Sequence, residues 1–166
     1  MATPTYDLLD STTLASSASS VTFTNIDQSY GDLVLVMSPI SDTGYGETQI
    51  ALNFNGDTGS NYAWVRMGGT GSTTVSSDNS SATFVYASGG TGPVEAGGGI
   101  WISQIMDYSA TDKHKSVLSR SNRADEATYA IASRWANTSA VTSITIGYPS
   151  DQYAAGSSFY LYGISK

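Results

Sequence analysis

Alternation of apolar and polar residues with a period of two constrains this chain more than any other feature. Residues 50–54 (IALNF), 144–148 (ITIGY) and 159–164 (FYLYGI) all follow it. A period of two places successive side chains on opposite faces of a β-strand. Turn residues separate such segments about every 8–12 residues, which is typical of sandwiches and barrels. We therefore predict a single-domain, all-β fold, an antiparallel β-sandwich of the jelly-roll type with roughly eight to eleven strands.

Two segments are apolar on both faces, and they predict strands at the centre of a sheet. They are residues 33–37 (LVLVM) and 100–105 (IWISQI), and we expect each to be covered on both sides. Further strands are predicted at 6–9, 21–24, 63–67, 82–86, 116–121 and 128–135. The expected core residues are Leu33, Leu35, Ile50, Leu52, Phe54, Ile102, Val117, Ile144, Ile146, Phe159 and Leu161.

Segments of low complexity lie between the predicted strands. Residues 11–20, 68–81 and 88–99 consist mostly of Ser, Thr, Ala and Gly, so we expect exposed loops there. We interpret residues 1–20 as an extended N-terminal arm with a lead-in strand, and residues 21–166 as the sandwich domain. The Ala-rich segment 123–132 predicts a turn at 124–126 followed by a strand, with a two-turn helix as the alternative.

Composition excludes several classes of function. The net charge of −7 has the wrong sign for a surface that follows phosphates, which argues against nucleic-acid binding. No apolar run reaches the roughly 18 residues of a membrane-spanning helix, and no secretory signal is visible at the N-terminus. The absence of Cys excludes disulfides, thiolate metal sites and thiol nucleophiles.

One segment has the oxygen-rich spacing of a calcium loop. Residues 53–62 (NFNGDTGSNY) place Asn, Asp or Gly at alternate positions. Calcium takes about six to eight oxygen ligands, yet Asp57 is the only charged residue here and Trp64 stands where such a loop carries Glu. Asn55-Gly56 and Asp57-Thr58-Gly59 are strong turn formers, so we predict a hairpin turn and no metal site.

The remaining candidates for catalysis are weak. His114 lies between two lysines, and no G-x-S-x-G nucleophile motif accompanies it. Asp42 with Glu47, and Asp125 with Glu126, cannot be placed across a substrate from their spacing alone. The glycine-rich segments 44–46, 69–71 and 90–92 complete neither a dinucleotide nor a Walker motif. We therefore predict no catalytic, cofactor-binding or metal-binding residues, and a protein that is not an enzyme.

Aromatic residues are abundant for so small a chain. Exposed rings beside Asn and Asp would suit sugar stacking, but packing in the core or at a subunit interface is the commoner use of Tyr and Trp. The aromatic residues concerned are Tyr45, Tyr62, Trp64, Trp101, Trp135, Tyr148, Tyr153, Tyr160 and Tyr162.

An ordered set of segments resembles a pattern seen in virion proteins of tailed phages, notably cyanophages. The segments are 6–9 (YDLL), 19–23 (SSVTF), 31–36 (GDLVLV), 52–62 (LNFNGDTGSNY), 144–146 (ITI) and 155–164 (AGSSFYLYGI). The pattern covers nearly the whole chain and occurs in phage structural proteins and within longer tail-fibre chains. With a Met start and no coiled-coil heptads, we expect a complete chain that forms neither a fibre shaft nor a hydrolase.

The resemblance implies a virion component, most like a capsid decoration or cement protein. Such a protein sits on the outer capsid surface as a homotrimer, binds the major capsid protein and bridges neighbouring capsid subunits. It binds neither nucleic acid nor membrane and needs no cofactor. The alternative is a tail-fibre or tail-associated module that binds host surface glycan, and a free-standing carbohydrate-binding or glycan-active protein comes third. The resemblance carries over no site residues; Tyr and Trp side chains are the expected anchors at the interface.

Overall fold

The computed structural model describes residues 5–43, 49–89, 99–123, 127–147, 149 and 151–166. The regular structure in these residues is strand, as the alternation predicts. The strands are β1 (Tyr6–Thr13), β2 (Ser20–Phe23), β3 (Asp32–Ser38), β4 (Ala51–Phe54), β5 (Tyr62–Gly69), β6 (Thr74–Ala82), β7 (Val85–Tyr86), β8 (Gly99–Met106), β9 (Lys115–Arg123), β10 (Ala127–Trp135), β11 (Ile144–Gly147) and β12 (Ser158–Ile164).

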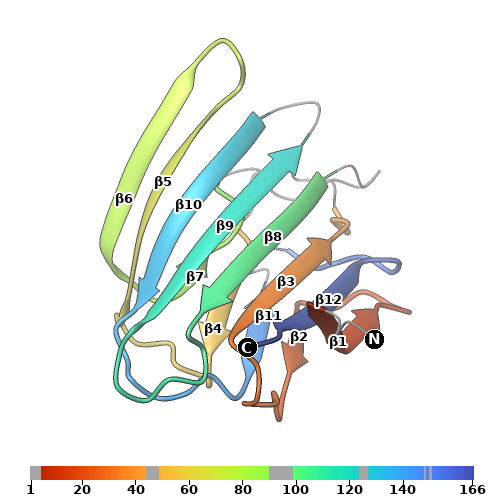
Figure 1. The fold of residues 1–166 in the computed structure, drawn as a ribbon. Helices are drawn as coiled ribbons and strands as arrows, with labels where there is room; N and C mark the ends of the chain where they lie inside the picture. The colour runs from red at the N-terminus through yellow and green to blue at the C-terminus, as the bar shows by residue number, and fades with distance from the viewer. Residues whose placement is uncertain (1–4, 44–48, 90–98, 124–126, 148, 150) are drawn as a thin grey trace.

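The strands form two antiparallel sheets of unequal size (Figure 1). The larger sheet has eight strands in the order β1-β12-β3-β8-β9-β10-β5-β6, and the smaller has four in the order β2-β11-β4-β7. Eight of the twelve strands follow the jelly-roll pattern, a long antiparallel hairpin wrapped around a core. In that hairpin β1 pairs with β12, β2 with β11, β3 with β8 and β4 with β7. The predicted jelly-roll sandwich is confirmed.

Two inserted strand pairs enlarge one sheet only. β5 and β6 follow β4 in the chain, and β9 and β10 follow β8. These four strands continue the large sheet beyond β8, so β6 lies at the end farthest from β1 (Figure 1). β6 falls in a segment predicted to be loop, and that prediction is wrong. Its nine residues form an edge strand that is mostly exposed on both faces, so no apolar alternation marks it.

The core lies between the sheets and holds most of the large side chains. Trp101, Trp135, Tyr62, Tyr108 and Tyr153 are almost completely buried there. Ten of the eleven predicted core residues are buried, and the exception is Ile102. Ile102 lies on the opposite face of β8 from Trp101, Ser103 and Ile105, which point into the core. Because apolar residues occupy both faces of this segment, the sequence alone does not show that Ile102 lies on the outer face.

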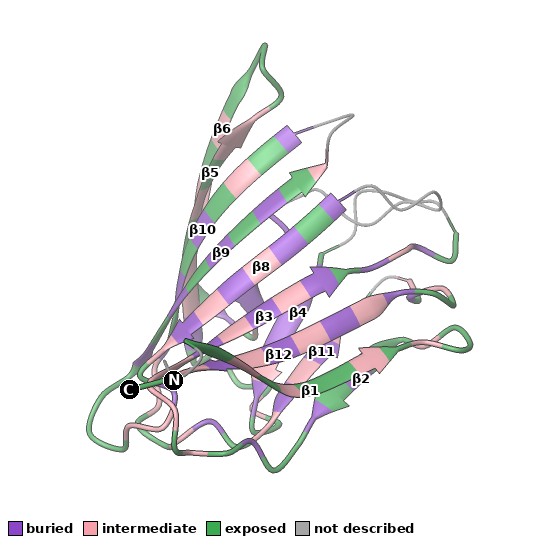
Figure 2. Cartoon of the chain, turned by 45° about the vertical axis from the view of Figure 1, so that its right-hand side comes forward, coloured by how far each residue is buried: buried purple, intermediate pink, exposed green. Residues whose placement is uncertain are grey.

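β3 and β8 are central strands, as predicted, but the expected cover on both faces is wrong for the described residues. β3 lies between β12 and β8, and β8 lies between β3 and β9. The small sheet covers their inner face, while on the outer face Ile100 remains 56% exposed. Buried and partly exposed residues alternate along both strands in Figure 2. The chain thus has apolar residues on an outer face that its described residues leave open.

The N-terminal segment joins the sandwich from residue 5 onward. β1 pairs with β12 at the edge of the large sheet, and Leu9 and Leu14 pack against the core. Residues 1–4 of the predicted arm lie outside the described residues. Residues 127–135 form strand β10, so the strand interpretation of that segment is confirmed over the helical one, while the turn predicted at 124–126 is not described.

Candidate functional site

The calcium-like segment 53–62 contains a turn, and the Asp57 carboxylate in it stabilises the fold through hydrogen bonds. Asn55 and Gly56 both have positive φ, and Asp57 N donates to Phe54 O at 2.9 Å, which closes the turn. The predicted hairpin is wrong, because β4 and β5 belong to different sheets. The Asp57 carboxylate accepts hydrogen bonds from Trp135 Nε1 at 2.8 Å, from Gly59 N at 2.9 Å and from Asn61 Nδ2. The Trp135 bond contributes most to holding the pKa of Asp57 below its ordinary value.

The other residues considered for catalysis lie apart. His114 is exposed in the loop before β9, beside an ion pair of 3.6 Å between Lys113 and Asp107. Asp42 is exposed after β3, whereas Glu47, Asp125 and Glu126 lie outside the described residues. Within the described ranges, no three His, Asp or Glu side chains are grouped closely enough to hold a metal ion. No helix of the described residues is long and apolar enough to cross a membrane.

The aromatic residues singled out in the sequence lie in the core or on the large sheet, apart from Tyr45 and Tyr148, which lie outside the described residues. Trp101 and Trp135 are core residues and Trp64 packs against the core, so packing in the core, the expected commoner use of these rings, is confirmed for them. Tyr6 is 56% exposed on β1. Tyr160 and Tyr162 are half-buried on β12, on the face opposite the core residues Phe159 and Leu161. Among the described residues, tyrosine on the large sheet therefore supplies the most exposed aromatic side chain.

The large exposed hydrophobic residues of the described chain all lie on one surface. That surface is the outer face of the eight-stranded sheet, here called the apolar face. Its most exposed members are Tyr6 and Leu8 on β1, Val65 and Met67 on β5, Ile100 on β8 and Leu118 on β9, each more than half exposed.

Strand register aligns the apolar face into continuous rows. One row runs directly across seven strands through Leu8, Tyr162, Val34, Gln104, Leu118, Ala132 and Val65. Seven strands at about 4.8 Å spacing give a row of roughly 29 Å. The adjacent row contains Tyr160, Val36, Ile102, Arg120, Ala130 and Met67. Only Gln104 in the first row and Arg120 in the second are strongly polar.

Arg120 lies where three hollows of the apolar face meet. One hollow of about 310 Å³ also involves Tyr6, Val34 and Leu118. A second, of about 670 Å³, involves Ile100 and Ile102, and a third, of about 680 Å³, involves Met67. Arg120 is exposed and forms no hydrogen bond or ion pair within the described part of the chain. Sequence reasoning missed this residue, because only the register brings it among apolar neighbours.

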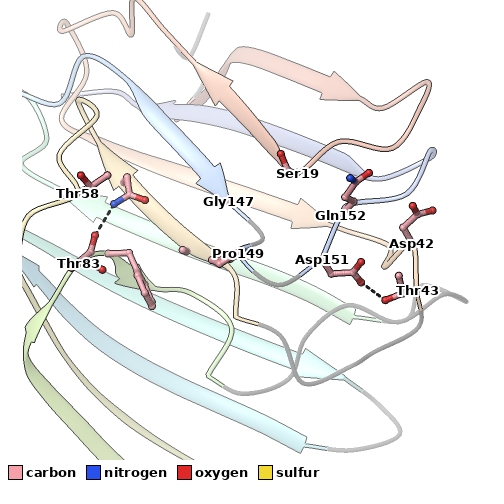
Figure 3. Close-up of a pocket in the computed structure, with 12 residues that line it drawn as sticks. Ser19, Asp42, Thr43, Thr58, Thr83, Gly147, Pro149, Asp151 and Gln152 are labelled. Atoms are coloured by element: carbon pink, nitrogen blue, oxygen red, sulfur yellow. Dashed lines mark hydrogen bonds between the residues drawn. The ribbon is translucent and has the colours of Figure 1, made fainter.

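The opposite side of the molecule carries a polar groove of about 690 Å³ over the four-stranded sheet (Figure 3). Its floor includes Ala51 on β4 and Gly147 on β11, which are paired in register. Thr58 and Thr83 lie at one end in Figure 3, and Asp42, Thr43, Asp151 and Gln152 lie at the other. Ser19, Asn53, Phe84 and Pro149 complete the lining.

Hydrogen bonds fix the acidic end of the groove. Asp151 Oδ2 accepts from Ser41 Oγ at 2.6 Å and from Thr43 Oγ1 at 2.7 Å. Desolvation opposes ionisation of Asp151, but these hydrogen bonds, together with backbone donors, outweigh it and lower the pKa of the carboxyl. Asp151 is therefore a carboxylate held in place at neutral pH.

Fold and surfaces together define a jelly-roll β-sandwich with an enlarged sheet and an open apolar face. No family model and no curated protein matches the chain. Among solved structures, exo-inulinase from Aspergillus awamori aligns with 96% of this chain at 13% sequence identity and a TM-score of 0.43. The aligned region spans 29% of the length of that enzyme. A likeness at this level bears on neither fold nor function.

Proposed function

We propose that this protein is a phage capsid decoration protein that attaches to the outer shell through the apolar face. The apolar face is the observation that carries the proposal. The virion pattern of the sequence points to the same class, since it resembles structural proteins of tailed phages. The protein then works by binding alone, bridging neighbouring capsid subunits.

The physical argument starts from the cost of leaving this face in water. Contiguous apolar patches larger than a few hundred Å² are uncommon on monomeric proteins and mark interaction sites. Six large apolar side chains that are each more than half exposed lie on one sheet face here, linked by the half-buried apolar residues of the same sheet face. A typical specific interface buries about 800 Å² on each partner. A row of roughly 29 Å across the sheet gives the length that such a contact needs.

Arg120 defines what the partner must offer. Arginine is enriched at the energetic centres of interfaces, where its planar guanidinium can bind a carboxylate through two hydrogen bonds. An unpaired guanidinium buried by apolar contact would be costly, so the partner surface must place a carboxylate or backbone carbonyls opposite Arg120. The capsid site is therefore expected to be apolar with an acidic centre.

A homotrimer completes the proposal. Three linked copies engage several capsid subunits at once, and linked contacts raise the overall affinity well beyond that of one copy. Light scattering on the purified protein tests the trimer. A monomer mass in solution, together with a single copy at each site on the particle, would contradict it.

The test of the proposed function uses particles of the source virus. Stripped particles should release their DNA at a lower temperature than intact ones, and adding the purified protein back should restore the difference. Leu118→Asp and Arg120→Glu proteins should fail to bind, because each places a carboxylate in the apolar face. Thr22→Asp, on the outer face of the small sheet, is the matched control and should bind normally.

Two results would overturn the proposal. Stripped particles that are equally heat-resistant but no longer adsorb to cells would favour a tail or receptor-binding role. Normal binding by the Leu118→Asp protein would show that the protein does not attach to the capsid through the apolar face.

A further inference from the structure

We infer that the groove over the four-stranded sheet is a second binding site, and that its ligand is a neutral oligosaccharide. The inference depends on the geometry of the groove and not on the capsid role. A volume of about 690 Å³ is large enough for a small-molecule ligand, since such sites span about 300–1,000 Å³.

The floor of the groove is low because two small residues meet there. Ala51 on β4 and Gly147 on β11 are paired in register. They lie on the sheet face opposite the one from which Leu52 and Ile146 enter the core. A Cβ atom placed on Gly147 would have its nearest neighbour, Ala51 O, at 3.9 Å. The space above Gly147 is therefore open, and a ligand can approach the sheet backbone closely.

The lining offers the contacts that a sugar needs. Sugar hydroxyls both donate and accept hydrogen bonds, and the groove presents carboxylates, hydroxyls and the side-chain amide of Gln152. The apolar face of a pyranose ring packs on rings of protein side chains. Phe84 is half-buried, with its ring 6.3 Å from that of Tyr86, and Pro149 is exposed in the same lining. Two rings together with hydrogen-bonding groups in one lining match a short chain of sugars.

Charge selects a neutral ligand over an acidic one. Asp42 and Asp151 are the charged residues of the described lining, and it contains no Lys or Arg. Sialylated, sulfated or phosphorylated glycans would meet carboxylates without a compensating cation. Like charges at short range are unfavourable, and the net charge of −7 adds to the repulsion.

The groove and the apolar face lie on opposite sides of the sandwich. The groove is on the outer side of the small sheet, and the apolar face is on the outer side of the large one. A protein attached through the apolar face would therefore leave the groove open to solvent. Both sites can be occupied at the same time.

The experiment is a binding titration of the purified full chain with neutral oligosaccharides of glucose, galactose, mannose and N-acetylglucosamine. Sialylated and sulfated oligosaccharides are titrated in parallel. Gly147→Leu fills the floor of the groove, Asp42→Asn removes the charge of one lining carboxylate, and Phe84→Ala removes a ring. Thr22→Leu, on the same sheet face but outside the groove lining, is the matched control.

At least one neutral oligosaccharide should bind, with affinity about tenfold or more lower in the Gly147→Leu protein, a loss of about 1.4 kcal/mol or more. The Thr22→Leu protein should bind as well as the original, and circular dichroism should show that both variants are folded. No binding of any neutral sugar, tighter binding of acidic sugars, or unchanged binding by a folded Gly147→Leu protein would each overturn the inference. The titration measures sugar binding and does not depend on capsid attachment. The sugar-binding inference and the capsid proposal can therefore be contradicted separately.

Discussion

The indole Nε1 of Trp135 donates a 2.8 Å hydrogen bond to Asp57 Oδ2 and so joins the two sheets at one end of the sandwich. Asp57 lies in the turn that follows β4 of the small sheet, and Trp135 ends β10 of the large sheet. The rings of Phe54, Tyr62 and Trp135 pack together beneath this contact. Tyr62 OH adds a 3.0 Å hydrogen bond to Asp57 O.

Removal of the Asp57 carboxylate should destabilise the protein. Asp57→Ala leaves the buried indole N–H without its acceptor, and we expect a loss of about 2 kcal/mol in the free energy of unfolding. Asp57→Asn retains one acceptor oxygen and should lose less. Urea denaturation at pH 7 measures both, and equal stability of the Ala variant and the original protein would contradict the structural role of this contact.

The lowered pKa of Asp57 predicts that the free energy of unfolding decreases at acidic pH. Hydrogen bonds in the folded state, led by that from Trp135, lower the pKa of Asp57 below its ordinary value of 3.8. The ionised form is therefore favoured by folding, so its contribution is complete above the unfolded pKa and is lost as the pH falls through the folded pKa. The Asp57→Asn protein should show a shallower loss of stability below about pH 4. Parallel acid curves for the two proteins would argue against this linkage.

Arg66 should stabilise the enlarged part of the large sheet. Its Nε donates to Ser77 Oγ at 2.6 Å, its Nη1 donates to Tyr86 OH and Gly89 O, and its guanidinium lies 5.5 Å and 5.7 Å from the ring centres of Tyr86 and Tyr129. Arg66→Ala should cost roughly 2–3 kcal/mol, since it removes charge-assisted hydrogen bonds and two cation–π contacts. Arg66→Lys retains the charge without the planar fork and should recover less than half of the loss. Thermal unfolding of both variants checks this; full recovery by Lys would show that charge alone matters.

Two glycines near the end of β12, Gly163 on the strand and Gly31 beside it, should respond differently to the same change. A Cβ on Gly163 would lie 2.4 Å from Tyr30 Cγ, so Gly163→Ala must displace the ring. We expect a loss of about 1–3 kcal/mol from this overpacking. A Cβ on Gly31 would have its nearest neighbour at 3.5 Å, so Gly31→Ala should stay within about 0.5 kcal/mol of the original. Equal melting temperatures for the two variants would show that Tyr30 moves at little cost.

Attachment to the capsid should persist in molar salt. The exposed charges that salt screens are few on the apolar face, and the Debye length falls to about 3 Å at 1 M. An ion pair at Arg120 would be enclosed by apolar contact and screened less. Sedimentation of decorated particles in 1 M NaCl measures retention, with protein release as the contradicting result.

The sequence predicted the jelly-roll sandwich because buried strands carry alternation wherever one face is covered. It missed β6, since an exposed edge strand rich in Ser and Thr needs no apolar face. It also placed a hairpin at Asn55-Gly56, where the turn instead carries the chain from one sheet to the other. Local turn chemistry fixes backbone angles, but the partner of each strand depends on the packing of distant segments.

The candidate surfaces were harder to predict for a related reason. Alternation shows that Ile100 and Ile102 share a face, yet not which face the rest of the chain covers. Val65 and Met67, two positions apart on β5, likewise share a face, but the sequence does not show whether that face is covered. The residues that flank Arg120 and Gly147 in the sequence do not indicate a functional role for either. Only the register of neighbouring strands shows that Arg120 has apolar neighbours and that Gly147 lies on the floor of the groove.

The position of β12 has a consequence for how the protein is made. β12 lies between β1 and β3, and its Phe159 and Leu161 are buried in the core. During synthesis, β1 and one side of β3 therefore lack their pairing partner until residue 164 has left the ribosome. A chain cut short before β12 loses the strand that joins its first strand to the rest of the large sheet. The large sheet is thus expected to close only after β12 has been synthesised, and nascent chains are expected to depend on protection of those open edges until then.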